Sequence, residues 1–465
     1  MKKKYLVLFL ICTQIVSVSA QKLHLAFSDS IIEKPFNIWI KTFDNGVFSI
    51  KDSFLVNNEN KQNIYFNLPN YIGYIEVLKD NKNAKNGIGI IFNPNEKDAI
   101  FLFNQEDIKK KNFLFKNSPE NIRYNILIDY MDKFFQKFGE IRKQRNTLNP
   151  FDSLYLNKLL HTETNQDALY SEMNLIVDSI LKVDTTLFTT KLADLLKTPC
   201  STSLPSYKKY FDNFNALLHY HLFDYVDFNN ENILNHPFFY DKIDQYFNLY
   251  CNDNNIQNGI DILMQKASKN EKVKSVVINY LVSYFLSNKN DDLVAYVYEK
   301  YGELCSINLG AKQMKEFSNI VHTQVGSTIP DIVLYDSKNN MQSVLQTASK
   351  NKYTIVYVWL SSCSACKTKT PKLVEQTKPY LNKGLSVFSI SLDENKDAWF
   401  SSILKYQTEK WTNVAELVTL QNSSILPKLN IRATPKLFII DNKGTIIAKD
   451  LYNDELNSEL KSLFK

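Results

Sequence analysis

Glycine is scarce in this chain of 465 residues, where it occurs 11 times, about a third of its usual frequency. The sequence contains no GxxxxGK[ST] segment, no complete GxGxxG segment and no GxSxG segment. It therefore lacks the phosphate-binding loops of P-loop and Rossmann proteins and the nucleophile elbow of α/β-hydrolases.

No charge of one sign dominates the chain. It carries 55 Lys and Arg residues against 49 Asp and Glu residues, and without Lys2, Lys3 and Lys4 the formal net charge falls from +6 to +3. This balance gives no global electrostatic reason to expect nucleic acid as a partner. Hydrophobic residues make up 44% of the chain and aromatic residues 13%, far too much for a disordered protein. The length predicts two to four globular domains.

Long hydrophobic runs are also missing, since no stretch approaches about 18 uninterrupted apolar residues. The first 20 residues carry three lysines, then the apolar run Tyr5–Ile11, and end on small or apolar residues at Val18 and Ala20. This layout predicts a secretory signal peptide cleaved after Ala20, and thus a periplasmic or otherwise extracytoplasmic protein. An uncleaved anchor, which would associate the chain with a membrane, stays open. A lipoprotein signal at Cys12 is disfavoured because Ile11 stands where such signals need a small residue.

Residues 21–116 alternate short β-type runs with polar turns, which predicts an antiparallel β-sandwich or open barrel. We find no catalytic constellation there, and the aromatic residues are interpreted as core and not as a binding platform, although a partner-binding role stays open. The runs are FNIWI, GVFSI, NIYFNL, GYIEVL, GIGIIF and AIFLF.

Residues 117–321 are expected to be helical. Ser118 suits an N-cap, Pro119 the first helical position, and Glu120 the positive end of the helix. Apolar residues then follow at helical spacing. Two such stripes are Leu127, Tyr130, Met131, Phe134, Phe135 and Phe138, and Val273, Val276, Val277, Tyr280, Leu281, Tyr284 and Phe285.

Residues 322–465 change to a βαβ-like pattern, which predicts a mixed α/β sheet. The whole chain is thus expected to be a multidomain α+β protein, with a β-sandwich-like, a helical and an α/β domain after the signal. The predicted strands are residues 332–335, 354–360, 385–392, 436–440 and 445–449, with helices after Cys363 and from Asp454 to Phe464.

The chemistry concentrates in Cys363 and Cys366, a CxxC at the junction between a buried strand and a helix. There the first cysteine meets unpaired backbone N–H groups and the positive end of the helix dipole, both of which favour its thiolate. The second lies one turn further on, where it can attack a mixed disulfide formed at the first. Zinc sites and plain structural disulfides use the same spacing.

The other cysteines do not complete a zinc site. Cys200, Cys251, Cys305 and His322 are scattered singly, so no metal is expected. His219 and His221 would point in different directions on a helix, which also argues against a metal pair. A disulfide between Cys200 and Cys251, with Cys305 as a buried thiol, stays open.

Several features around the CxxC occur together. They are Pro330 and Asp331 opening the first strand, Trp359 four residues before Cys363, Lys367, Pro371 in the following helix, Thr434-Pro435, and the FxIDxxG pattern of Phe438, Ile440, Asp441 and Gly444. In this combination residues 325–465 resemble the thioredoxin superfamily, most closely the extracytoplasmic thiol-disulfide oxidoreductases related to ResA and TlpA.

The resemblance implies an enzyme that exchanges disulfides with protein thiols and disulfides, reset by an unidentified electron-donor protein. Its catalytic residues would be Cys363 and Cys366, which need no cofactor beyond their own disulfide. Pro435 would be a cis-proline facing the sulfurs, and Thr434 would pair with a substrate strand, beside Trp359.

Two positions depart from the family pattern. Tyr357 stands where thioredoxins keep a buried acid, and Lys369 where the ResA group has an acidic residue. Proton transfer at Cys366 therefore has no evident carboxylate, which leaves solvent, Tyr357 or another domain to serve. The uncharged pair Ser364-Ala365 favours an intermediate or reducing couple over a strong oxidant, and the expected reaction runs in the reducing or isomerising direction.

Two hypotheses from other classes remain. In one, the chain is a binding or scaffold protein with a dormant thioredoxin-like domain. In the other it is a peroxidase, which is weaker because Leu360 stands where peroxiredoxin-like sites need threonine.

Overall fold

The computed structural model describes residues 22–29, 32–68, 71–80, 87–97, 99–103, 114–181, 184–203, 214–302 and 307–465. The predicted signal segment, Cys12 and Cys305 lie outside these residues. The chain divides into two compact units, Met1–Val277 and Ile278–Lys465. This division falls within one helix, α9 (Glu271–Ser287). The domain limits after residues 116 and 321 stay predictions.

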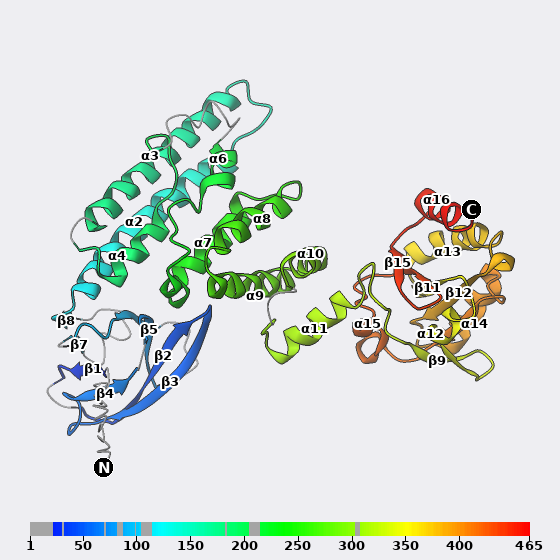
Figure 1. Ribbon diagram of the computed structural model, residues 1–465, viewed down its shortest axis with the longest axis horizontal. Helices are drawn as coiled ribbons and strands as arrows, with labels where there is room; N and C mark the ends of the chain where they lie inside the picture. The colour runs from blue at the N-terminus through cyan, green and yellow to red at the C-terminus, as the bar shows by residue number, and fades with distance from the viewer. Residues whose placement is uncertain are drawn as a thin grey trace, which may run out of the picture. The chain divides into compact units, whose positions relative to one another are not determined.

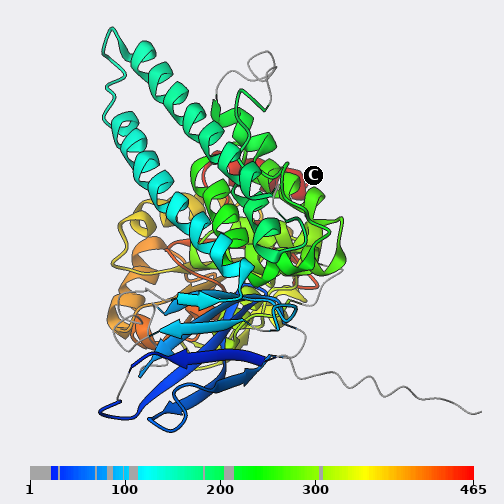
Figure 2. The same ribbon diagram turned by 90° about the vertical axis from the view of Figure 1, so that its left-hand side faces the viewer.

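The first unit begins with two four-stranded sheets that enclose a common hydrophobic core (Figures 1 and 2). Buried and less buried residues alternate along strands such as β2, as a half-buried strand requires. One sheet has the order β4-β1-β7-β8 and the other β3-β2-β5-β6. The strands are β1 (Lys22–Phe27), β2 (Phe36–Asp44), β3 (Val47–Val56), β4 (Ile64–Asn67), β5 (Gly73–Lys79), β6 (Ile88–Phe92), β7 (Ile100–Phe103) and β8 (Leu114–Lys116).

The predicted sandwich is confirmed, but one of its strand pairs is not antiparallel. β1 pairs in parallel with β7, so that His24 lies opposite Ile100. Of the five strands between them in sequence, β2, β3, β5 and β6 form the second sheet, and β4 pairs with the other edge of β1. The alternation of apolar and polar residues predicts which face of a strand is buried, but it does not predict which strand lies beside it.

Helices follow in the first unit. Two long ones, α2 and α3, lie side by side, as the cyan and teal ribbons of Figures 1 and 2 show. No helix in the described part of the chain is long and apolar enough to span a bilayer. The elements are α2 (Pro119–Asn146), α3 (Tyr155–Leu181), α4 (Phe188–Ala193), η1 (Asp194–Leu196), α6 (Phe214–His221), η2 (Glu231–Asn235), α7 (Pro237–Leu249), α8 (Ile256–Ala267) and the start of α9.

The start of α2 is as predicted at Ser118, whose side chain accepts a hydrogen bond from the Asn121 N–H. Glu120 lies in the first turn of α2, as predicted, but its buried carboxylate accepts hydrogen bonds from a neighbouring helix. It accepts hydrogen bonds from the N–H groups of Phe188 (2.7 Å) and Thr189 (2.8 Å) at the start of α4. The start of α2 is capped instead by the carboxylate of Glu96, which accepts a hydrogen bond from the Glu120 N–H at 2.8 Å.

The second unit is built on a seven-stranded mixed sheet of order β10-β9-β13-β12-β11-β14-β15. The predicted fold class, a multidomain α+β protein with an α/β C-terminal part, is confirmed. Seven of its elements were not predicted: β10, α12, η4, α14, β13, η5 and α15. The elements are α10 (Asp291–Tyr301), α11 (Ala311–Val321), β9 (Val333–Asp336), β10 (Met341–Ser343), α12 (Val344–Ala348), β11 (Tyr353–Trp359), α13 (Ser364–Thr377), η4 (Leu381–Lys383), β12 (Leu385–Ser391), α14 (Lys396–Tyr406), β13 (Thr412–Ala415), η5 (Leu420–Asn422), α15 (Ile425–Lys428), β14 (Lys436–Asp441), β15 (Ile446–Lys449) and α16 (Asp454–Leu463).

Within this unit, the segment before β14 is tied to α10 and α11. The guanidinium of Arg432 donates to Asp291 at 2.6 and 2.9 Å and to Glu316 at 3.1 Å. The side chain of Asn430 donates to the same Asp291 carboxylate at 2.8 Å. Paired contacts of this kind fix the direction of both groups. They hold the chain two residues before Thr434.

Candidate functional site

The CxxC lies where the central strand β11 ends and α13 begins. All residues of β11 but the first are buried, because β12 and β14 flank it and helices cover it. The chain then turns, and Cys363 becomes the N-cap of α13, with its sulfur accepting the Cys366 N–H at 3.4 Å. The N-terminus of a helix carries unpaired N–H groups and a partial positive charge. The sequence thus places a sulfur where negative charge is stabilised.

Cys363 is partly exposed, and its pKa lies below the usual value of 9.0. Burial opposes ionisation, but hydrogen bonds from the Thr434 side chain and from the backbone N–H groups of Cys366 and Ala365 outweigh it. Hydrogen bonds to the charged form lower a pKa. Cys363 is therefore the more easily formed thiolate of the pair.

Cys366 is its opposite. Only 1% of its surface is exposed, and burial raises its pKa to about 12. It packs in one hydrophobic cluster with Tyr357 and Trp359. Both sulfurs are unpaired thiols in the structure, so this geometry is that of the reduced pair. The two thiols thus differ in both access and acidity.

The loop before β14 faces the first cysteine. The Cys363 thiol donates to the Thr434 carbonyl oxygen at 3.3 Å, and the Thr434–Pro435 peptide bond is cis, as predicted. Both loop residues are half-buried. Four of the predicted site residues, which come from two segments 68 to 72 positions apart along the chain, therefore meet at one place.

Trp359, the fifth predicted site residue, does not lie at the surface. It is 3% exposed, and its indole N–H donates to Ser389 on β12 at 2.8 Å. In this arrangement Trp359 supports the core beneath Cys366, and a contact with substrate stays a prediction.

The two positions that depart from the family pattern also have partners. The Tyr357 hydroxyl lies 2.8 Å from the Thr370 hydroxyl, and burial raises the pKa of Tyr357 well above its usual value of 10. A tyrosine of this kind stays protonated at neutral pH and is no base. The Lys369 ammonium lies over the ring of Tyr452, 3.5 Å from its centre. In the described part of the chain, no carboxylate makes a hydrogen bond with Cys366.

Asp393 is a carboxylate that the sequence analysis missed. It follows β12, is 4% exposed, and accepts hydrogen bonds from the Ser361 N–H (3.1 Å), the Ser361 hydroxyl (2.6 Å) and the Ser391 hydroxyl (2.7 Å). These bonds hold the turn two residues before Cys363. The available signal was its place directly after a buried strand parallel to β11, since such strands end at the same edge of a sheet.

The other described cysteines, Cys200 and Cys251, lie in the first unit, and the Cys251 sulfur is 3.7 Å from the Nδ1 atom of His219. Cys200 and Cys251 are both unpaired, so the disulfide considered between them is not formed. His219 bonds to the Tyr250 carbonyl and Asn258, whereas His221 bonds to Asp224, in agreement with their different predicted directions. Among the described residues no group of three or more potential metal ligands comes together.

Tyr452 fixes the loop that faces the cysteines, since its hydroxyl donates to the Pro435 carbonyl oxygen at 2.6 Å. We expect Tyr452→Phe to slow protein-disulfide reduction roughly fivefold, because one hydrogen bond of about 1 kcal/mol no longer holds the loop. The measurement is kcat/KM with a protein disulfide as substrate. Tyr335→Phe is the control, since Tyr335 is 58% exposed on the strand β9. Equal rates for wild type and Tyr452→Phe would show that this bond does not position the loop.

Comparison with known families agrees with the geometry. Residues 351–446 match a family described as Thioredoxin-like, so the C-terminal part of this chain has the thioredoxin-like fold, as predicted. The match spans β11, the CxxC, α13 and β14. No curated protein matches the chain.

Several solved structures that are similar to part of the chain come from Bacteroides species. The thioredoxin domain of a thiol-disulfide oxidoreductase from Bacteroides vulgatus is 27% identical over 30% of this chain and 99% of its own, with a TM-score of 0.28. A thiol-disulfide oxidoreductase from Bacteroides fragilis is 26% identical over the same shares, also with a TM-score of 0.28. A thioredoxin-like protein from Bacteroides caccae is 17% identical and covers 54% of this chain and 91% of its own, with a TM-score of 0.33.

Proposed function

We propose that this chain is an exported thiol-disulfide oxidoreductase of the ResA and TlpA kind that acts on protein thiols and disulfides through Cys363 and Cys366. The observation that carries the proposal is the contrast between the two sulfurs at the start of α13. One is accessible with a lowered pKa, and the other is buried with a pKa of about 12. A nucleophile and a protected resolving thiol need these two environments.

In the reducing direction, the Cys363 thiolate attacks one sulfur of a substrate disulfide. A Cys363–substrate disulfide forms, the substrate disulfide breaks, and the other substrate sulfur leaves as a thiolate that takes up a proton. Cys366 then loses its proton and attacks the Cys363 sulfur, which releases the second substrate thiol and leaves a Cys363–Cys366 disulfide. Two electrons have passed to the substrate. A dithiol electron-donor protein restores the pair by the same exchange.

Loss of the Cys366 proton is the demanding step, because burial raises the pKa of this thiol to about 12. The thiolate of the leaving substrate sulfur is a suitable acceptor, since it is generated within the same site. Solvent water is a second acceptor for the Cys366 proton. Without an adjacent carboxylate, resolution of the mixed disulfide is slower than its formation.

The loop at Thr434 and Pro435 is proposed to hold the substrate. Thr434 lies in contact with Cys363, and an extended substrate segment that paired with its backbone would bring its own cysteine against the exposed sulfur. No nucleic acid or metal takes part in this mechanism. The signal-like first 20 residues support action outside the cytoplasm, where disulfides form.

The test is capture of the mixed disulfide. Cys366→Ser is expected to hold a substrate protein covalently on Cys363, as a band that disappears on reduction and is identified by mass. The matched control is the double variant Cys363→Ser/Cys366→Ser, which keeps Cys200 and Cys251. A mixed disulfide that maps to Cys363 supports the proposal. Adducts of equal yield in the double variant, or no adduct with a protein disulfide in excess, would favour a dormant domain in a binding or scaffold protein.

A further inference from the structure

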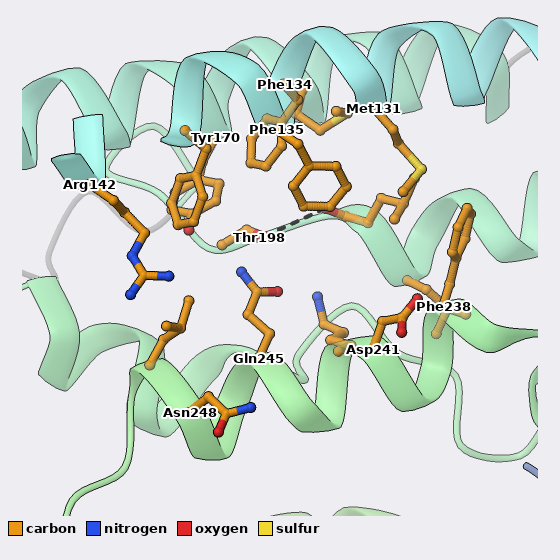
Figure 3. A pocket seen from close by; sticks show the side chains of 16 residues that line it. Met131, Phe134, Phe135, Arg142, Tyr170, Thr198, Phe238, Asp241, Gln245 and Asn248 are labelled. Carbon is orange, nitrogen blue, oxygen red and sulfur yellow. Dashed lines mark hydrogen bonds between the residues drawn. The ribbon is translucent and has the colours of Figure 1, made fainter. Parts of the chain in front are cut away.

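The first unit contains a cavity of about 440 Å³ that the redox mechanism does not use. It lies between α2, α3 and α7, and its volume falls within the range of small-molecule sites. Figure 3 shows Met131, Phe134 and Phe135 of α2 on one side and Asp241, Gln245 and Asn248 of α7 on the other. The cavity thus has an apolar wall that faces a polar one.

The apolar wall is unusual for its exposure. Phe135 belongs to the stripe predicted as core, yet 53% of its surface is exposed, and Phe134 is only partly buried. Exposed aromatic surface is costly in water unless something covers it. Both rings line the hollow, and Phe134 also contacts the ring of Tyr170 on α3, with 5.7 Å between the ring centres.

Two cations line the cavity, Lys242 on α7 and Arg142 on α2, together with the carboxylate of Asp241 on α7. Lys242 is 5% exposed, and its ammonium donates to the Lys197 carbonyl at 2.9 Å. Within the described residues no carboxylate pairs with Lys242, and none pairs with the exposed guanidinium of Arg142. Arg142, an exposed cation at the edge of the cavity, is therefore suited to pair with the acid group of a ligand.

A second, smaller cavity of about 180 Å³ adjoins the first at Arg142 and Asn248. Its other lining residues are mainly polar and include Arg145, which pairs with Glu163 at 3.5 Å. Arg142 therefore stands where an apolar compartment meets a polar one. Asp241 lies away from Arg142, near Phe238 (Figure 3), where it would repel a second acid group.

We propose that this cavity binds a small organic acid with one carboxylate and an aliphatic or aromatic body. The body lies against Phe134 and Phe135, and the carboxylate lies at Arg142, within reach of the polar compartment. Burial lowers the pKa of Lys242 to about 7, so a bound anion would also favour its protonated form.

The test is calorimetric titration of the full chain with decanoate, and with 1-decanol and decylamine as probes of the same chain length. Decanoate is expected to bind at one site, at least tenfold more tightly than either other probe. Arg142→Gln is expected to weaken decanoate about tenfold, whereas its exposed neighbour variant Lys143→Gln leaves binding unchanged. Phe135→Ser is expected to weaken decanoate and decanol alike, because it shortens the apolar wall.

Equal binding of decanoate and decanol would overturn the assignment of an acid, and wild-type affinity in Arg142→Gln would overturn its placement. No binding of any probe would overturn the site itself. Circular dichroism of each variant confirms that helices are retained. Cys363→Ser is expected to bind decanoate as the wild type does, so this result is independent of the proposed redox activity.

Discussion

Cys363→Ser is expected to lose protein-disulfide reduction entirely, with a fall of about 1,000-fold or more to the uncatalysed rate. The thiolate is the attacking species in disulfide exchange, and a serine hydroxyl at the same place is neither ionised near neutral pH nor able to form a disulfide. The measurement is the initial rate of insulin reduction with a small dithiol as electron donor. Cys366→Ser is expected to lose turnover as well, but to keep the first attack.

Cys251→Ser is the matched control for Cys363→Ser. Cys251 is a half-buried thiol in the first unit, 3.7 Å from a nitrogen of His219, and burial raises its pKa to about 12. Its removal takes away one thiol without touching the start of α13, so full activity is expected. Residual reduction by Cys363→Ser above the background rate would contradict the mechanism.

The geometry around the CxxC could be predicted because its causes are local. A buried β-type run before Cys363, and a helix pattern after it, are enough to place the first sulfur at a helix N-terminus. The cis bond before Pro435 followed from the resemblance. The contact between the Thr434–Pro435 loop and Cys363 joins distant parts of the sequence, and only the resemblance predicted it.

Other parts of the fold depend on partners distant in sequence. The Glu120 carboxylate caps α4 some 68 residues later, which no rule about the first turn of α2 could show. β13 has only four residues, too few for its pattern to be distinguished from the flanking sequence. β1 pairs in parallel with β7, although β2 to β6 lie between them in the sequence. Short sequence patterns therefore predict which residues are buried better than they predict which strands pair with each other.

The cavity shows a third kind of limit. The stripe from Leu127 to Phe138 correctly indicated a helix with one apolar face, and Leu127, Met131 and Phe138 are buried. Phe135 lies at the edge of that face, where burial depends on how closely α7 approaches. Periodicity gives the direction of a side chain and not the distance to the next helix.

The contrast between the two active-site thiols predicts a large difference in alkylation. In the reduced protein, iodoacetamide is expected to modify Cys363 first at every pH from 6 to 9. The Cys363 rate should fall as pH falls through its lowered pKa, because protonation removes the thiolate, and level off above it. Cys366, with a pKa of about 12, holds roughly one part in 10,000 as thiolate at pH 8 and is also buried, so it should react far more slowly.

Peptide mass mapping at early times separates the two sites. Cys251 in the other unit serves as an internal control, because its pKa, like that of Cys366, is raised to about 12. Thr434→Val sharpens the test, because it removes the side-chain hydrogen bond that helps to lower the pKa of Cys363. The midpoint of the Cys363 rate should then move to higher pH, while Cys251 stays unreactive. Equal early labelling of Cys363 and Cys366 would mean that the two environments do not differ as the structure shows. Inertness of both would support a dormant domain.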